Sequence, residues 1–342
     1  MISLLVVNYR SAALAADAIG SARAATSGPL QVVVVDNSCD PAEAERLRPV
    51  ADTLLVAETN GGYAGGINLG RRACESETIV VTNPDVTFAP NAIDRLASTL
   101  DAKTAVAGPA LFWDEAHQWM LPPADLNTTA QKLDEVLATR SRAWFEQRDR
   151  RRFRARLAFW SLARTTGVRV LSGAVLAIRA ADFDEVGGFD ERFRLYFEEV
   201  DFLRRIAARR KRIAYVPEAR CRHLYNQSAG QDAAAAGARY VESEMRYLEK
   251  WSGPFAARLL KRLERGMPVR DALPFDGSIA VDRDDVVVEA SPLASFSTAA
   301  GHFPRGGRVT LPDDVLRALR SETLYLRVVT RSGDVVATLR KP

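Results

Sequence analysis

The sequence is poor in the residues and runs that mark disulfide-bonded, zinc-binding or membrane-spanning proteins. Its three cysteines, Cys39, Cys74 and Cys221, are widely spaced and odd in number, which argues against a disulfide framework and a paired-thiolate zinc site. No stretch approaches the roughly 20 apolar residues that a membrane-spanning helix needs. The apolar start of the chain has no basic leader and is more typical of a buried strand than of a signal peptide. We therefore expect a cytoplasmic protein, either soluble or held peripherally at the inner face of the cell membrane.

Two common binding motifs are also missing. The first apolar run, Ile2–Val7, leads to VNYRS and not to a glycine-rich fingerprint, which argues against a nicotinamide oxidoreductase. The chain has no recognised nucleic-acid module, so we expect no nucleic-acid partner.

Positive charge is concentrated between Arg140 and Arg169. The basic and aromatic segment Ser141–Trp160 is predicted to be either a solvated helix or a contact with anionic lipid headgroups, and the sequence leaves both open.

Apolar runs alternate with helical segments over about the first 110 residues, which predicts an α/β fold with a doubly wound, mostly parallel sheet and flanking helices. Ligands of such sheets bind beyond the carboxyl ends of the strands. Asn8, Asp36 and Asp85 each follow a predicted strand, so we expect them at one edge. Beyond Gly266 short strands predominate. We therefore predict a domain over 1–266, with a basic helical insertion at about 114–165, and a small β-rich domain over 267–342.

Three polar clusters stand out against this pattern. Glu198, Glu199 and Asp201 lie within four positions at a predicted helix start, where like charges repel; a pocket that binds a cation or removes a proton would use them. The other clusters are the glycine loop Asn60–Gly70 and the segment Thr82–Val86. Each also has a simpler interpretation, as a solvated helix start or as turns built from turn-forming residues.

Together, these segments resemble the family 2 glycosyltransferases of the GT-A fold, in the rhamnosyltransferase-like branch. The resemblance covers residues 1 to about 255 and leaves out the C-terminal appendage. The matching segments are, in order, VNYRS, VVVVDNS, NGGYAGGINLG, TNPDV, LSGAVLAIR, VGGFDERFRLYFEEVD, YVPEARCRH and QS. The resemblance implies transfer of a sugar, with rhamnose as the first choice, from a dTDP- or UDP-linked donor to a hydroxyl of a saccharide or lipid-linked saccharide in surface-polysaccharide assembly.

The resemblance also implies site residues. Asp36 would accept the N3–H of a uracil or thymine, and the glycine loop would pack against the nucleotide. Asn83-Pro84-Asp85 corresponds to the family's DXD site with Asn in the first place, so Mg²⁺ or Mn²⁺ would be held by Asp85, by His223 and by substrate phosphates. A lone histidine is more often structural, and an Asn-Pro-Asp turn is the alternative. The nucleotide-binding candidates are Asn8, Tyr9, Asp36, Asn60, Gly61, Gly65, Asn68 and Asn83.

Glu198 and Glu199 correspond to the family's Glu-Asp pair, whose second member is the catalytic base. Glu199 is one methylene longer than the usual Asp, and Glu198 would orient the acceptor in a single inverting displacement. Further substrate-binding candidates are Ser172, Gly173, Asp201 and Ser228. The alternative function is a non-catalytic nucleotide-sugar or carbohydrate-binding protein, because the first metal Asp is missing and Glu replaces the usual base. A homodimer is left open.

Overall fold

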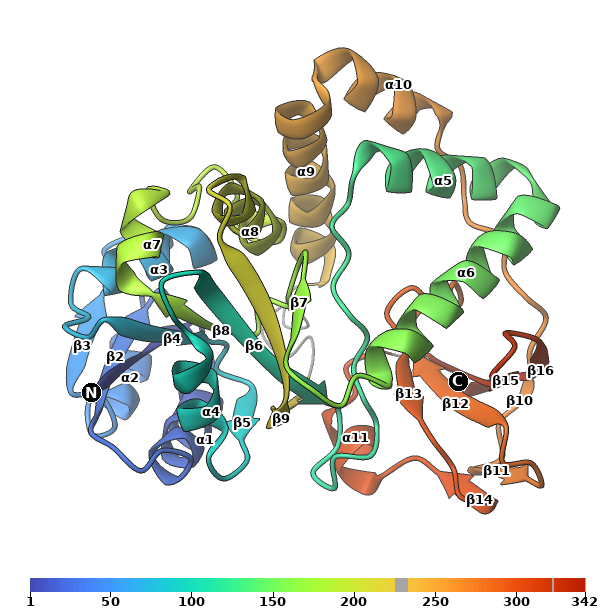
Figure 1. Cartoon of the computed structure of the whole chain (residues 1–342), viewed down its shortest axis with the longest axis horizontal. Helices are drawn as coiled ribbons and strands as arrows, with labels where there is room; N and C mark the ends of the chain where they lie inside the picture. The colour runs from blue at the N-terminus through green and yellow to red at the C-terminus, as the bar shows by residue number, and fades with distance from the viewer. Residues whose placement is uncertain (225–232, 322, 342) are drawn as a thin grey trace. The chain divides into compact units, whose positions relative to one another are not determined.

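The computed structural model describes residues 1–224, 233–321 and 323–341, and the chain forms two compact units (Figure 1). The first unit contains Met1–Leu111, Ala124–Leu126 and Ala163–Tyr247. The second contains Phe112–Pro123, Asn127–Leu162 and Leu248–Pro342. Residue 266, the expected boundary, lies within the second unit, whose last segment begins at Leu248. This unit also contains the helical segment 127–162, which was expected in the first domain.

A large sheet forms the centre of the first unit. The strands β3, β2, β1 and β4 lie side by side and run parallel, β8 then pairs antiparallel with β4, and β6 pairs antiparallel with β8. The remaining strands continue in the order β9 and β5, with β7 paired to β9. The expected α/β class with a mostly parallel sheet is therefore confirmed. The strands are β1 Ile2–Asn8, β2 Leu30–Asp36, β3 Thr53–Val56, β4 Thr78–Thr82, β5 Val86–Phe88, β6 Thr104–Phe112, β7 Thr166–Val168, β8 Val175–Arg179 and β9 Arg212–His223.

Helices cover both faces of this sheet because its strands are apolar on both faces. Leu4 and Val6 of β1 belong to a core shared with the helices α1, α2 and α4, whereas Val7 faces α3. α3 comes close to β1 because Gly66 has no side chain: a Cβ there would lie 2.7 Å from Cγ1 of Val7. The helices are α1 Ala12–Ala24, α2 Pro41–Leu47, α3 Gly62–Arg71, α4 Ala92–Thr99, α7 Ala180–Glu185, α8 Glu198–Ala208 and α9 Ala233–Ser252, which continues into the second unit.

The second unit combines helices with two small sheets. Its larger sheet has the strand order β10-β16-β15-β12-β13, and β11 pairs with β14 separately. Phe153 and Trp160 of α6 pack against Val287 and Val329 of this sheet. The expected β-rich C-terminal region is therefore present. The elements are α5 Thr129–Arg140, α6 Arg142–Trp160, α10 Pro254–Leu263, β10 Leu273–Pro274, β11 Ser278–Val281, β12 Val286–Ser291, β13 Ala300–His302, β14 Gly307–Thr310, α11 Asp313–Ala318, β15 Leu324–Thr330 and β16 Val335–Lys341.

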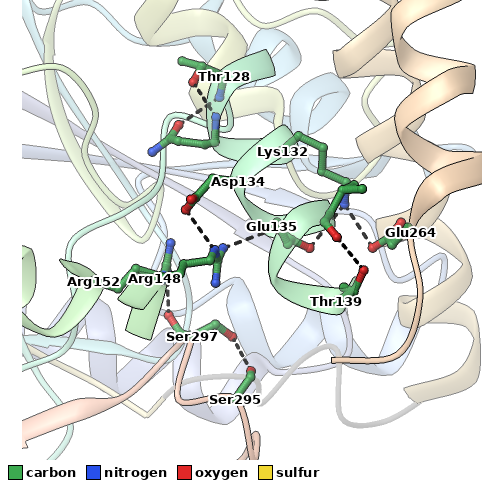
Figure 2. Close-up of polar contacts among 12 residues, drawn as sticks. Thr128, Lys132, Asp134, Glu135, Thr139, Arg148, Arg152, Glu264, Ser295 and Ser297 are labelled. Carbon is green, nitrogen blue, oxygen red and sulfur yellow. Dashed lines mark hydrogen bonds and ion pairs between the residues drawn. The ribbon is translucent and has the colours of Figure 1, made fainter. Parts of the chain in front are cut away.

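The arginines of α6 are engaged within the second unit. Arg156 donates to buried Glu289 at 2.7 Å, and Arg148 lies 3.3 Å from Asp134 of α5. Arg152 donates to the backbone carbonyl of Ser297, as Figure 2 shows. Three further arginines bind Asp334, Asp134 and the Ser332 carbonyl: Arg150, Arg151 and Arg154. α6 is therefore packed against its own unit, and its exposed arginines Arg150, Arg151 and Arg154 also contact residues of that unit.

Candidate active site

The adjacent ends of β1 and β2 hold a buried cluster of polar side chains. Asn8 pairs with Asp36 in the strand register, and its Nδ2 donates to Asp36 Oδ1 at 2.9 Å and to Glu43 Oε2 at 3.2 Å. Asp36 also accepts from the backbone N–H and hydroxyl of Ser38. Asn8 and Asp36 are fully buried. The side chain of Asn8 therefore positions the Asp36 carboxylate, while the neighbouring Tyr9 stays partly exposed.

The glycine loop at the start of α3 uses its glycines in different ways. Asn60 Oδ1 accepts from the Gly62 N–H at 2.9 Å, and Gly62 has a φ of +79°. A Cβ at Gly62 would meet the Arg194 carbonyl, to which the Tyr63 N–H donates. By contrast, a Cβ at Gly61 or Gly65 would meet no non-neighbouring atom nearer than 3.9 Å. These two positions leave backbone open to a ligand.

Asn68 of the same helix is engaged with the protein itself. Its Nδ2 donates to the Phe189 carbonyl at 2.8 Å and to Glu191 Oε1 at 2.9 Å, and its Oδ1 accepts from the Phe189 N–H. A Cβ on Gly188 would lie 2.5 Å from Asn68 Oδ1, so only glycine fits beside this amide. Asn68 therefore fastens the segment 188–191 to α3, a structural contact that the motif did not predict.

The segment after β4 brings Asp85 beside His223. Val86 of β5 pairs with His223 of β9, and the Leu224 N–H donates to the Asp85 carbonyl at 3.1 Å. As a result, His223 Nε2 lies 3.3 Å from Asp85 Oδ1, and both side chains are nearly buried. The backbone N–H of Asn83 donates to the Ala174 carbonyl. Among residues 1–224, 233–321 and 323–341, no group of three or more His, Cys, Asp and Glu side chains is arranged to hold a metal.

The acidic helix α8 begins after two residues with left-handed backbone. Tyr196 and Phe197 both have a φ of 69°, a conformation that costs energy for bulky residues. Phe197 is held by rings of α9: its centroid lies 5.3 Å from those of Tyr240 and Tyr247. This turn fixes where Glu198 starts the helix. Backbone strain next to carboxylates is typical of functional sites.

Asp201, in contrast, serves the helix. It is fully buried, and its Oδ2 accepts from Arg205 Nε at 2.8 Å, one turn further along α8. Arg205 also donates to the Val186 carbonyl, so the pair ties α8 to the end of α7. Ser228 lies outside the described residues.

Tyr63 connects the glycine loop with the carboxylates. Its hydroxyl donates to the Gly173 carbonyl at 3.5 Å. Burial raises the pKa of Tyr63 well above its usual value, and Glu198, Glu199 and Asp85 raise it further because all three negative charges lie near the phenol. The loop, Asp85 and the acidic helix start are therefore brought together around one side chain. Tyr63 was not among the site residues predicted from the sequence, although it lies within the loop motif.

Gly173 and Ser172 belong to the segment that lies beside the side chain of Glu199. A Cβ on Gly173 would lie 3.0 Å from Cβ and Cγ of Glu199, so glycine here makes room for the glutamate side chain. Ser172 Oγ accepts from the Ala174 N–H at 3.3 Å and supports the turn before β8.

Glu43, which accepts from Asn8 and from the Ala12 N–H, is a second residue that sequence reasoning missed.

Glu198 and Glu199 are carboxylates in an unfavourable environment for negative charge. Burial raises the pKa of Glu198 well above its usual value, with a further contribution from the charge of Glu199, and burial also raises the pKa of Glu199. The Oε2 atoms of both are buried, and neither has a hydrogen-bond partner among the described residues. Buried acceptors without a partner at two successive positions of one helix start are well suited to receive a hydroxyl donor.

This environment predicts a pH-dependent stability. The folded-state pKa of Glu198 lies above its usual value of 4.5, so the folded protein binds this proton more tightly than the unfolded chain. Stability should be greatest below the usual value and fall as pH rises through the raised pKa. The variant Glu198→Gln should lack this pH dependence and should melt about 2–4 °C higher than wild type at pH 8. Thermal unfolding in the presence of a chelator, followed by circular dichroism, measures the difference. Glu185→Gln, at an exposed acid, is the matched control. If the melting temperature of Glu198→Gln changed with pH as steeply as that of wild type, the prediction would be wrong.

Comparison with known proteins places the chain in a family. Residues 1–240 match the family model described as glycosyltransferase like family 2. The chain belongs to this family. It is 28% identical over 294 residues to the N-acetylglucosaminyl-diphospho-decaprenol L-rhamnosyltransferase of two Mycobacterium tuberculosis strains, a match that covers 78% of this chain and 90% of the relative. The resemblance to family 2 glycosyltransferases that the sequence motifs indicated is thus confirmed.

Solved structures of other transferases are more distant from this family member. The mannosyltransferase PcManGT of Pyrobaculum calidifontis, in complex with GDP-Man and Mn²⁺, is 15% identical with a TM-score of 0.46, over 77% of this chain and 73% of that one. TarS 1-349 of S. aureus is 15% identical with a TM-score of 0.42, over 73% and 70% of the two chains. Within the described ranges of the present chain, no helix is both long and apolar enough to cross a membrane.

Proposed function

We propose that this glycosyltransferase inverts configuration and moves a hexose, with rhamnose as the first choice, from a dTDP- or UDP-linked donor to a hydroxyl of a saccharide or lipid-linked saccharide in surface-polysaccharide assembly. The observation that carries the proposal is the contact of Tyr63, in the glycine loop, with Gly173, the glycine that makes room for Glu199; the phenol also lies near the charges of Asp85 and Glu198. The name of the mycobacterial relative, an L-rhamnosyltransferase for N-acetylglucosaminyl-diphospho-decaprenol, supports the choice of sugar and of a lipid-linked acceptor.

The nucleotide is proposed to lie along the ends of β1 and β2 and against the start of α3. Asp36 would accept the base N3–H with a carboxylate already held in place by Asn8. Gly61 and Gly65 leave room for the nucleotide beside the backbone. Tyr9 would line this site, Asn60 shapes its loop, and Asn83 lies next to the metal position. Asn68 would act as a positioning residue, since its amide is engaged with Phe189 and Glu191.

A divalent cation fits the pair formed by Asp85 and His223. Their donor atoms lie 3.3 Å apart and offer one carboxylate and one imidazole, a set that leaves most coordination positions to diphosphate oxygens and water. Mg²⁺ or Mn²⁺ bound there would offset negative charge on the departing diphosphate. Because Asn83 replaces the first acid of the motif, Asp85 is the sole carboxylate of this set.

The transfer step is assigned to the acidic pair. Glu199 would take the proton from the acceptor hydroxyl as its oxygen bonds to the anomeric carbon, while the bond from that carbon to the diphosphate oxygen breaks on the opposite face and configuration inverts. Burial raises the pKa of Glu199 towards the range in which a carboxylate is an effective base. Glu198, which starts the same helix, would orient the acceptor hydroxyl. Gly173 would leave the room that the longer glutamate arm needs.

The substitution Asp85→Asn tests the proposed metal site. It keeps an oxygen ligand but removes the charge, so the Mn²⁺ concentration for half-maximal turnover of dTDP-rhamnose or a UDP-sugar should rise by at least about tenfold. Release of nucleoside diphosphate measures the turnover, and NMR of the product gives its anomeric configuration. Asp17→Asn, at an exposed acid of α1, should behave as wild type. Nucleotide binding without any turnover in the wild-type protein would instead support the non-catalytic binding protein.

A further inference from the structure

The outer face of α10 combines exposed apolar and basic side chains. Phe255 is 80% exposed and Leu259 is 45% exposed, while Arg258 and Arg262 also face solvent. Their spacing of three, four and seven residues places them on one side of the helix. The other side is used for packing: Ala257 and Leu260 are buried, and α10 contacts α5. Figure 1 shows α10 as the helix that follows α9.

The charge of this face is one-sided. The segment Pro254–Leu263 contains three basic residues and no acidic one. Within the described part of the chain, neither Arg258 nor Arg262 has a hydrogen-bond or ion-pair partner, whereas Lys261, on the inner side, binds Glu264 at 2.9 Å. This differs from α6, whose arginines bind carboxylates and carbonyls of their own unit. The positive charge of α10 is therefore available to a partner outside the chain.

We propose that the outer face of α10, formed by Phe255, Arg258, Leu259 and Arg262, docks on an anionic lipid surface. A helix with apolar and basic residues on its exposed side lies in the membrane interface, where rings and aliphatic chains enter the headgroup layer and guanidinium groups meet lipid phosphates. Phe255 and Leu259 are neighbouring exposed apolar side chains, and contiguous apolar surface beside polar residues marks an interaction site. An anionic bilayer satisfies both kinds of side chain at once.

A second copy of the chain is a poorer occupant for this face. Most homodimers use a two-fold contact in which the same surface meets itself. Such a contact would bring Arg258 and Arg262 of both copies together without any acidic residue of α10 to offset them.

The proposal also stands apart from the proposed transfer reaction, because α10 belongs to the second unit and contributes no residue to the candidate active site.

Vesicle co-sedimentation of the full chain tests this surface. Wild type should sediment with vesicles of phosphatidylcholine and phosphatidylglycerol, bind far less to phosphatidylcholine alone, and dissociate as salt screens the charges. Each basic residue near an anionic surface contributes about fivefold to binding, so Arg258→Gln with Arg262→Gln should lower the partition coefficient about 25-fold. Phe255→Ser with Leu259→Ser should weaken binding as well.

Controls separate this surface from general charge and from misfolding. Arg72→Gln with Arg305→Gln removes two exposed arginines elsewhere and should bind vesicles nearly as wild type does. All these variants alter exposed side chains, so their melting temperatures should match the wild type. Equal binding of wild type to neutral and anionic vesicles, or unchanged binding of the α10 variants, would overturn the proposal. So would a wild-type dimer in sedimentation velocity that becomes a monomer in the Phe255 and Leu259 variant, without vesicle binding by either.

Discussion

Glu199→Gln should lower the rate of sugar transfer by about a thousandfold while the protein stays folded and still binds its donor. Glutamine keeps the size of the side chain and its place against Gly173 but cannot take the acceptor proton. Nucleoside diphosphate release at saturating donor and acceptor gives kcat, and calorimetric titration of the nucleotide diphosphate with Mn²⁺ gives donor affinity. A loss confined to kcat is the signature of a base, because the base acts only in the transition state.

Two variants make this experiment specific. Glu199→Asp restores the acid that the family usually carries, on a side chain one methylene shorter, and should retain more activity than the glutamine variant. Glu185→Gln, at an exposed acid of α7 paired with Arg209, should leave kcat unchanged. Near-normal turnover of Glu199→Gln would exclude Glu199 as the base and direct attention to Glu198, whose carboxylate lies in the same buried environment.

The sheet and one edge of the site could be predicted because they depend on local pattern. Continuous apolar runs predicted the parallel strands, and the rule that ligands bind at their carboxyl ends placed Asn8 and Asp36 together, as the register of β1 and β2 confirms. The approach of His223 to Asp85 came only from family resemblance, because it depends on the antiparallel pairing of β5 with β9. Sequence spacing does not reveal such a pairing.

The contacts of individual polar side chains were less predictable. The motif made Asn68 a nucleotide-binding candidate, but nothing in the sequence indicates that Phe189 and Glu191 use its amide. Glu43 occupies the third position of a short helix, where a glutamate normally supports a cap, and instead it reaches Asn8 and the start of α1. In both cases the partner is far away in sequence, so only the folded chain identifies it.

The arginine-rich segment shows the same limit on a larger scale. Its charges suggested solvent or lipid because sequence spacing alone does not connect them with their partners. Yet the partners are visible as single charged residues in otherwise apolar strands: Glu289 in VVVEAS and Arg327 in LYLRVVT. These two residues are directly opposed in the pairing of β12 with β15. A lone charge inside a buried strand predicts a buried ion pair, although it does not identify the helix that completes it.

Arg327→Met should destabilise the second unit by about 3–5 kcal/mol. Arg327 is 1% exposed and donates to Glu289 at 2.7 Å and to both oxygens of Asp149 on α6. Its removal leaves Glu289 with Arg156 and Asp149 with Arg270, two carboxylates each short of a buried partner. Urea unfolding followed by tryptophan fluorescence reports on this unit alone, because all five tryptophans, at positions 113, 119, 144, 160 and 251, lie in it.

The matched control for this substitution is Arg150→Gln, which removes another arginine of the same unit. The pair that Arg150 forms with Asp334 is more than half exposed on both sides, so its loss should cost less than about 1 kcal/mol. A wild-type urea midpoint in Arg327→Met would mean that the network contributes little. The second unit would then owe its stability to the apolar contacts of Phe153 and Trp160 with β12 and β15.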